Sequence, residues 1–227
     1  EGIDALVLDV KCGSGAFMKT IEDARKLARS LVETGTAMGK SVTALITDMN
    51  QPLGRTVGNA LEIRESLAIL QGSGPADSQA LTIELAVRML ALAGIDQPHP
   101  LEKLKDGSAL QLFRKMVACH GGDLDAGLPE AGKQIPLPAA ASGYVSRVDA
   151  EAIGRASLLL GAGRSKTTDS IDPAVGISDL KKVGERIERG EPLCIIHSNS
   201  REDPARLSQL MDAAFEISPR PAEPPLL

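Results

Sequence analysis

The stretch ALVLDVK at residues 5–11 is a short, nearly continuous apolar run rich in branched side chains. Such a run predicts a β-strand that is buried on both faces. A second β-rich run, VTALIT, follows at residues 42–47. Between the two runs, Thr20 and Asp23 can cap a helix in which apolar residues recur at helical spacing. Residues 5–47 therefore predict a β-α-β unit with parallel strands.

Three more helices are predicted before about residue 128. Capping residues or a strongly apolar helical pattern mark each of them, and the predicted ranges are 59–70, 81–93 and 108–119. A loop rich in glycine and proline, at residues 48–58, leads into the first of these helices.

The composition changes after residue 128, because ten of the fourteen prolines lie from Pro129 onward. Short β-rich segments broken by glycine predict strands at residues 135–141, 143–148, 156–160, 174–177 and 192–197. A helix is predicted at residues 204–214 and an extended, proline-rich tail at residues 219–227.

These patterns give an α/β fold class, with a smaller C-terminal α+β domain after the parallel-sheet portion. We expect one domain at residues 1–128, a linker at 129–134 and the C-terminal domain at 135–227. The chain opens with Glu1, directly before an apolar run, which suggests that it is cut from a longer protein.

The composition argues against several classes of partner. The net charge is -5 and the lysines and arginines are scattered, so nucleic acid and anionic membrane surfaces are not expected to bind. No apolar run approaches the roughly 20 residues that span a bilayer. The three cysteines are odd in number and widely spaced, which favours a reducing compartment such as the cytoplasm.

Two loops are candidates for binding. The first, KCGSGAF at residues 11–17, follows a strand end, where ligands of open α/β sheets bind, and Lys11 can offer charge to a phosphate. Its Gly-x-Gly pattern is equally that of a tight turn. In the second loop, Glu65 can reach back from the following helix and, with loop carbonyls, hold a hard cation. Alternatively, Glu65 pairs with an arginine of its own helix or faces solvent.

The remaining chemistry-bearing residues form no recognisable catalytic set. His99 is expected to cap or face solvent, and His120 to mark a helix end. Cys194 and His197 would need two further ligands to bind zinc. We therefore assign no catalytic residue within the chain.

Several segments, in collinear order over essentially the whole chain, resemble the pyrimidine nucleoside phosphorylases, the thymidine phosphorylase family. They are residues 8–18 (LDVKCGSGAFM), 47–65, 106–110 (DGSAL), 160–164 (LGAGR), 171–177 (IDPAVGI), 184–193 (GERIERGEPL) and 218–226 (SPRPAEPPL).

The resemblance implies a homodimeric, cytoplasmic pentosyltransferase. Such an enzyme cleaves a pyrimidine nucleoside, thymidine or also uridine, with inorganic phosphate, and releases the base and a pentose 1-phosphate. The resemblance also implies a C-terminal domain similar to the barrel hybrids of biotinyl and lipoyl carriers.

Four positions carry over from the family to this chain. Phe17 matches a residue that packs against the pyrimidine ring. Leu53 and Thr56 match residues whose backbone carbonyls bind a potassium ion, and Glu65 matches the carboxylate ligand of that ion. The family's phosphate-binding and pyrimidine-gripping side chains and its active-site histidine lie upstream of Glu1, so the chain alone is expected to be inactive.

Three alternatives stay open from the sequence. A carrier or binding module would fit the C-terminal domain, but no Met-Lys pair occurs in residues 135–227. A phosphoribosyltransferase of related fold would not be expected to keep that domain. A non-catalytic or truncated subunit is the third alternative.

Overall fold

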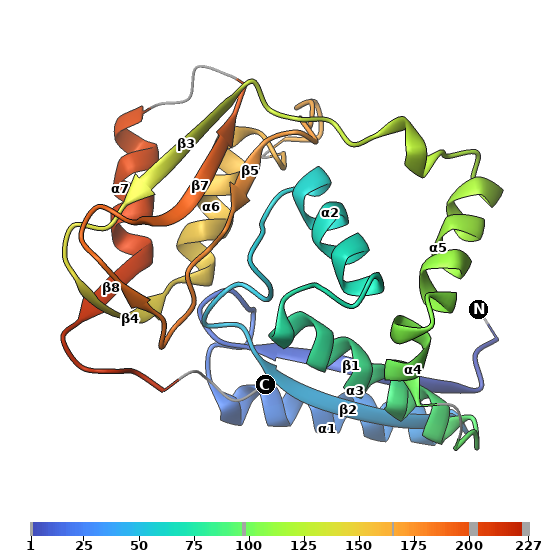
Figure 1. The fold of residues 1–227 in the computed structure, drawn as a ribbon. Helices are drawn as coiled ribbons and strands as arrows, with labels where there is room; N and C mark the ends of the chain where they lie inside the picture. Colours follow the sequence, from blue (N-terminus) through green and yellow to red (C-terminus); the bar gives the residue numbers. More distant parts are fainter. Residues whose placement is uncertain (1, 97–98, 165, 200–203, 224–227) are drawn as a thin grey trace.

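The computed structural model describes residues 2–96, 99–164, 166–199 and 204–223. The chain begins with the predicted β-α-β unit, formed by strand β1 (Ala5–Cys12), helix α1 (Ile21–Ala37) and strand β2 (Ser41–Asp48). The two strands pair in parallel, with Ala5 opposite Ser41. Helix α1 runs along this sheet (Figure 1).

The N-terminal cap of α1 forms as predicted, because the Thr20 hydroxyl accepts a hydrogen bond of 3.2 Å from the Asp23 amide. The core beneath the helix is small and centres on Val10, Ala24 and Ala28. The prediction that the first strand is buried on both faces is wrong. Both strands of a two-stranded sheet are edge strands, and most residues of β1 are only partly buried.

A series of helices follows the β-α-β unit: α2 (Asn59–Leu70), α3 (Ala76–Leu92), α4 (Pro100–Lys105), α5 (Ser108–Cys119) and the 3-10 turn η1 (Leu124–Ala126). Helices α2 and α5 have the predicted bounds, α3 starts earlier than predicted, and α4 was not predicted. Helix α3 packs against β1, and α2 contacts both β5 and α5. Helix α2 thus lies between the N-terminal and C-terminal parts of the chain (Figure 1).

The C-terminal part contains two three-stranded antiparallel sheets and two helices that pack against each other. The strand orders are β3-β7-β5 and β6-β4-β8. The bounds are β3 (Lys133–Pro138), β4 (Gly143–Val148), α6 (Ala150–Leu160), β5 (Gly176–Ser178), β6 (Arg186–Ile187), β7 (Pro192–Ser198), α7 (Pro204–Ala214) and β8 (Phe215–Ser218). This arrangement confirms the predicted fold class.

The predicted linker overlaps the first strand of the C-terminal part. Strand β3 begins at Lys133, inside the range 129–134 that the sequence suggests as a linker, and the domain division itself stays a prediction. Of the predicted tail, residues 221–223 have no regular structure, and residues 224–227 lie outside the described part.

The strand predicted at residues 156–160 is wrong, because this segment is the second half of helix α6. The Asp149 side chain caps that helix by accepting a hydrogen bond of 2.8 Å from the Ala152 amide. The buried residues Ile153, Ala156 and Leu160 recur at helical spacing. A short, continuous apolar run does not distinguish a buried helix from a buried strand, which explains the error.

The larger hydrophobic core lies in the C-terminal part and includes the fully buried Ile153 and Ile177. Val57, from the loop between β2 and α2, packs against this core. Val57 and Ile177 also exchange two backbone hydrogen bonds of 2.8 Å each. Gly176 permits this contact, since its φ is +149° and a Cβ there would lie 2.2 Å from the Val57 carbonyl oxygen.

Replacing Ile153 by alanine should leave a cavity in this core and lower the free energy of unfolding by about 2–5 kcal/mol. Leu158→Ala is the matched control on the same helix, because the Leu158 side chain is 39% exposed. The control should cost about 1 kcal/mol or less. Urea unfolding followed by circular dichroism measures both variants, and equal losses would contradict the assigned core.

Candidate functional site

The β2–α2 loop, residues 49–58, lies between the β-α-β unit and the C-terminal sheets. Its start is fixed by the loop after β1, because the Gly15 amide donates a 2.9 Å hydrogen bond to the Met49 carbonyl. Its end is fixed by Glu62, whose carboxylate accepts a 2.9 Å hydrogen bond from the Gly58 amide. The N-cap of α2 is therefore Gly58, directly before the predicted helix range 59–70, and Glu62 takes part in the cap.

A cavity of about 380 Å³ opens beside this loop. Leu53, Thr56 and Glu65, the three residues that the sequence resemblance marks as cation ligands, all line it. Lys11, from the first candidate loop, lines the same cavity. The structure thus brings residues from both candidate loops to one place.

The backbone carbonyls of the β2–α2 loop differ in whether they have a partner. Within residues 52–58, five carbonyls accept hydrogen bonds, and they are those of Pro52, Gly54, Arg55, Val57 and Gly58. The carbonyls of Leu53 and Thr56 accept none from any described residue. Unpaired oxygen atoms of this kind suit a hard cation.

Glu65 contributes the carboxylate of this oxygen-lined site. Its Oε2 atom accepts a 2.8 Å hydrogen bond from the Arg55 amide. A Cβ on Gly54 would lie only 1.9 Å from Oε1, so the loop closes on the carboxylate at a glycine with a φ of +70°. Burial raises the pKa of Glu65 above its ordinary value, and the hydrogen bond from Arg55 opposes that effect.

The alternative that Glu65 pairs with an arginine of its own helix is not what the structure shows. Arg64, the neighbouring arginine on α2, forms an ion pair of 3.1 Å with Glu130 instead. The described residues thus leave the Glu65 carboxylate with the loop backbone. A buried, partly hydrogen-bonded carboxylate gains the most from a bound cation, because the cation stabilises its charged form.

The glycine-containing loop after β1 packs against the β2–α2 loop. A Cβ on Gly13 would lie 2.5 Å from the Asn50 amide nitrogen, and the Ser14 hydroxyl donates a 3.0 Å hydrogen bond to the Asn50 carbonyl. Gly13 therefore serves both a tight turn and a close approach of two backbones. Beyond this turn the Phe17 side chain is 99% exposed, so it contributes to no core and is free to contact a ligand.

Lys11 is less available for a phosphate than its position in the sequence suggests. Its ammonium forms an ion pair of 2.7 Å with Asp9 and donates a 3.0 Å hydrogen bond to the Thr47 hydroxyl. The Asp9 carboxylate balances its charge. The ammonium therefore stabilises the sheet end more directly than it offers a free positive charge to the cavity.

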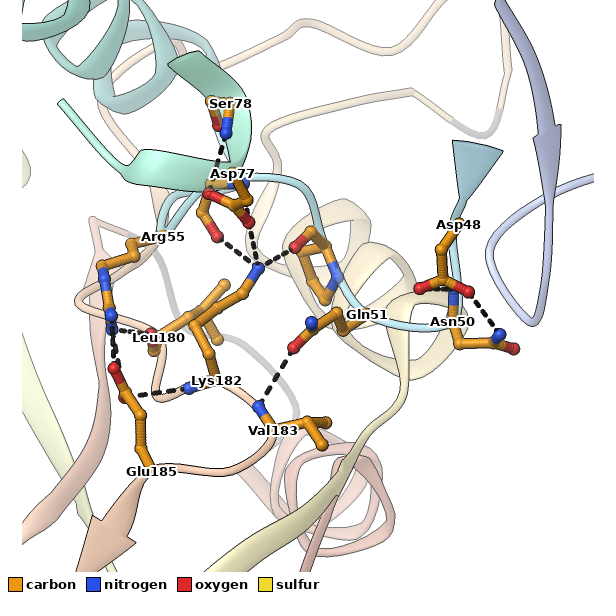
Figure 2. Close-up of polar contacts among 12 residues, drawn as sticks. Asp48, Asn50, Gln51, Arg55, Asp77, Ser78, Leu180, Lys182, Val183 and Glu185 are labelled. Atoms are coloured by element: carbon orange, nitrogen blue, oxygen red, sulfur yellow. Dashed lines mark hydrogen bonds and ion pairs between the residues drawn. The ribbon is translucent and has the colours of Figure 1, made fainter. Parts of the chain in front are cut away.

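On its other side, the β2–α2 loop is held by charged residues of the C-terminal part (Figure 2). The Lys182 ammonium contacts the Pro52 carbonyl, the Gly54 carbonyl at 2.9 Å and the Asp77 carboxylate at 2.8 Å. The Lys182 side chain is only 12% exposed. Burial disfavours the charged form of Asp77, but the hydrogen bond and charge of Lys182 outweigh it and lower the pKa of Asp77.

A second charged contact lies next to the first. The Arg55 guanidinium forms an ion pair with Glu185 and donates a 2.9 Å hydrogen bond to the Leu180 carbonyl. Burial disfavours the charged form of Glu185, but the hydrogen bonds from Arg55 and from the Lys182 amide, together with the positive charge of Arg55, lower the pKa of Glu185. The Gln51 side chain completes the contact by accepting a 3.1 Å hydrogen bond from the Val183 amide.

Sequence reasoning missed the role of Lys182 and Asp77 at the loop. Lys182 is 128 residues away from Gly54 in the chain, and no spacing motif joins residues so far apart. Lys182 lies in no recognisable motif, and it reaches the loop only because two segments far apart in the sequence pack together.

The histidines and cysteines have structural roles. His99 caps α4, its ring accepting a 3.3 Å hydrogen bond from the Leu101 amide, and His120 ends α5, both as expected. The Nε2 atom of His197 lies 2.8 Å from the Ser178 hydroxyl, which donates to Asp179, so the pair ties β7 to β5. Burial raises the pKa of the Cys194 thiol to about 12, which keeps it protonated.

Among the described residues, no group of three or more His, Cys, Asp or Glu side chains is arranged to hold a metal ion. A site built mainly from backbone carbonyls, such as the one that the sequence resemblance implies at Leu53 and Thr56, has other ligands than such a group. No helix in the described ranges has the length and apolar character needed to cross a membrane.

Two protein families match successive parts of the chain. The family described as glycosyl transferase family, a/b domain, matches residues 1–110. The family described as pyrimidine nucleoside phosphorylase C-terminal domain matches residues 144–218. The segment between the two matches includes the predicted linker at residues 129–134.

Similar proteins cover most or all of the chain. The thymidine phosphorylase of Mycobacterium tuberculosis strain H37Rv is 48% identical over 202 residues, which are 89% of this chain and 47% of that protein. The pyrimidine-nucleoside phosphorylase of Geobacillus stearothermophilus is 44% identical over 237 aligned positions, which cover 100% of this chain and 54% of that protein. A pyrimidine-nucleoside phosphorylase of Staphylococcus aureus is 43% identical over the same length.

The chain therefore spans about half the length of the curated relatives that it matches. Both successive family matches and the level of identity agree with the predicted resemblance. On these grounds the chain belongs to the pyrimidine nucleoside phosphorylase family, and it carries the family's C-terminal domain.

Proposed function

We propose that this chain serves the phosphorolysis of pyrimidine nucleosides, a pentosyl transfer in which phosphate replaces the base. The bond between the anomeric carbon and the base nitrogen breaks, and a bond from that carbon to a phosphate oxygen forms. The products are the free base and a pentose 1-phosphate. The observation that carries the proposal is the cavity in which Leu53, Thr56 and Glu65 meet, within a chain of this family.

The Leu53 and Thr56 carbonyls and the Glu65 carboxylate are proposed to hold a potassium ion. Two carbonyls without hydrogen-bond partners among the described residues and a half-buried carboxylate fit such an ion. When bound, the ion supplies positive charge that fixes the β2–α2 loop next to the phosphate site. The chain's own part is to position this loop and to shape one wall of the cavity.

Phe17 is proposed to form an apolar wall for the pyrimidine ring of thymidine or uridine. Its exposed side chain offers an aromatic face at the end of β1, where ligands of α/β sheets bind. Such a wall excludes water and limits the orientation of the base during attack at the sugar carbon. We further propose that no group of this chain donates or accepts a proton in the reaction. The groups that do so are proposed to correspond to the half of the relatives' sequences that this chain does not match.

A homodimer in the cytoplasm is proposed on the strength of the family resemblance. The widely spaced cysteines support a reducing compartment, since Cys12, Cys119 and Cys194 are all free thiols.

A carrier function is the principal alternative. A carrier lysine needs an exposed ammonium, and the Lys182 ammonium is held by Asp77 and two loop carbonyls. This observation speaks against Lys182 as a modified residue and does not concern Lys181. Intact mass spectrometry that found biotin or lipoate on the chain would favour the carrier.

The proposed function is tested by complementation. This chain is expected to show no phosphorolysis of thymidine or uridine alone, and to show it when joined to the N-terminal half of the Geobacillus stearothermophilus relative. Release of free base, measured by absorbance, reports the reaction. Activity of the chain alone would contradict the proposed division of catalytic groups, and an inactive but folded chimera would contradict the proposed function.

Changing Glu65 to glutamine in the active chimera should raise the potassium concentration for half-maximal activity at least roughly tenfold, because a charged ligand is lost. In the unchanged chimera, potassium affinity should fall as the pH is lowered toward the raised pKa of Glu65, since the proton and the cation compete for one carboxylate. Glu65→Gln should lose this pH dependence. The matched control is Glu130→Gln, on the ion pair with Arg64 outside the cavity, and it should leave the potassium response unchanged.

Changing Phe17 to alanine should reduce kcat/KM for the nucleoside roughly tenfold, because the stacking surface for the base is lost. The free energy of unfolding should stay the same, since the Phe17 side chain is 99% exposed. Phe17→Tyr keeps the aromatic face and should retain most activity. Steady-state kinetics with both variants distinguish a binding role from an incidental exposed residue, which would leave kcat/KM unchanged.

A further inference from the structure

The Lys182 ammonium is a buried cation with a complete set of partners. A lysine ammonium has three N–H donors, and Lys182 has three oxygen acceptors, on Pro52, Gly54 and Asp77. Its side chain is 12% exposed and that of Asp77 is 27% exposed. Such a charge stays buried only when a paired group offsets the loss of hydration, which Asp77 does here.

The contacts of Lys182 divide the carbonyls of the β2–α2 loop into two groups. The Pro52 and Gly54 carbonyls accept hydrogen bonds from the ammonium, whereas the Leu53 carbonyl between them has no such partner among the described residues. The Arg55 carbonyl is likewise taken by the Leu180 amide, at 3.1 Å, which leaves the carbonyl of Thr56. The C-terminal part thus occupies the carbonyls that do not belong to the proposed cation site.

Gly54 connects the two sides of the loop. Its amide donates a 3.2 Å hydrogen bond to Asp77 and its carbonyl accepts one from Lys182. A Cβ at this position would lie 1.9 Å from the Glu65 carboxylate. Gly54 therefore joins the Lys182 contact to the Glu65 carboxylate, because no side chain separates the two groups.

We propose that Lys182 is a positioning residue of the cation site, holding the loop so that the Leu53 and Thr56 carbonyls and Glu65 are kept for the ion. This inference rests on the proposed potassium site. It assigns to the C-terminal domain a direct part in cation affinity, through one ammonium and its counterion Asp77.

The opposite effect of Lys182 is also physically conceivable, so the test must separate the two. A positive charge near a cation site repels the ion, and removing it would then strengthen potassium binding. Asp77 neutralises the ammonium, and the carbonyls accept its hydrogen bonds, so the structure favours positioning over repulsion.

The experiment uses the chimera with the Geobacillus stearothermophilus N-terminal half and the variants Lys182→Met, Lys182→Arg and Lys182→Met with Asp77→Asn. The double variant leaves no unpaired buried carboxylate, so it separates positioning from simple destabilisation. Lys181→Met is the matched control, because the Lys181 ammonium makes no hydrogen bond or ion pair with any described residue, and only its amide is bound, to Leu193.

Two readouts are measured at constant ionic strength, with choline chloride replacing potassium chloride. The first is the rate of amide hydrogen exchange in residues 49–65. The second is the half-saturating potassium concentration, determined once from the protection against exchange and once from the activity. Lys182→Met and the double variant should speed exchange in this loop and raise the half-saturating potassium concentration roughly tenfold. Lys181→Met should match the unchanged protein, and Lys182→Arg should lie between them.

The outcomes separate this inference from the proposed function. If the unchanged chimera shows no potassium effect on exchange or activity, the cation site fails, and the inference fails with it. A second outcome is that potassium acts equally on the unchanged chimera, on Lys182→Met and on the double variant. In that case the cation site stands, and Lys182 has no positioning role. A lower half-saturating concentration in Lys182→Met would also overturn the inference, because it would show that the ammonium competes with the ion.

Discussion

The docking of the β2–α2 loop onto the C-terminal sheets is the interaction on which the rest of the arrangement depends. Val57 and Ile177 pair as residues of neighbouring antiparallel strands do, at a point where both segments carry a glycine. A Cβ on Gly58 would lie 2.5 Å from the Val175 carbonyl, and one on Gly176 would lie 2.2 Å from that of Val57. The backbones approach closely only because side chains are absent there. This contact fixes where the loop carbonyls lie.

Charge pairs across the same contact have a different role from the backbone bonds. Lys182 with Asp77 and Arg55 with Glu185 each bring a cation and an anion together, so the interface carries partly buried charge with little net charge. Pairs of this kind add little stability over apolar packing, since hydration is lost, but they specify one arrangement. Among the described residues, this arrangement leaves the Leu53 and Thr56 carbonyls without a hydrogen-bond donor, on the same cavity as the Glu65 carboxylate.

The local elements of the fold followed from the sequence where local signals agree. Thr20 caps α1, and the runs at β1 and β2 pair as parallel strands, both as predicted. The capping role of His99 was also expected, but helix α4 itself was not predicted, because it is too short for a periodic pattern to mark it. The misread segment at residues 156–160 has the same physical origin, since an apolar run of five residues has no period.

The sequence by itself determined the β-α-β unit, the fold class, the family resemblance and the set Phe17, Leu53, Thr56 and Glu65 as candidates. These depend on residues close together in the chain or on motifs in collinear order. Only the tertiary structure decided that Leu53, Thr56 and Glu65 share one cavity, that Lys11 is paired with Asp9, and that Lys182 binds the loop. The physical reason is that a hydrogen bond between residues 128 positions apart leaves no periodic or spacing signal, because it forms only when two separately folded surfaces meet.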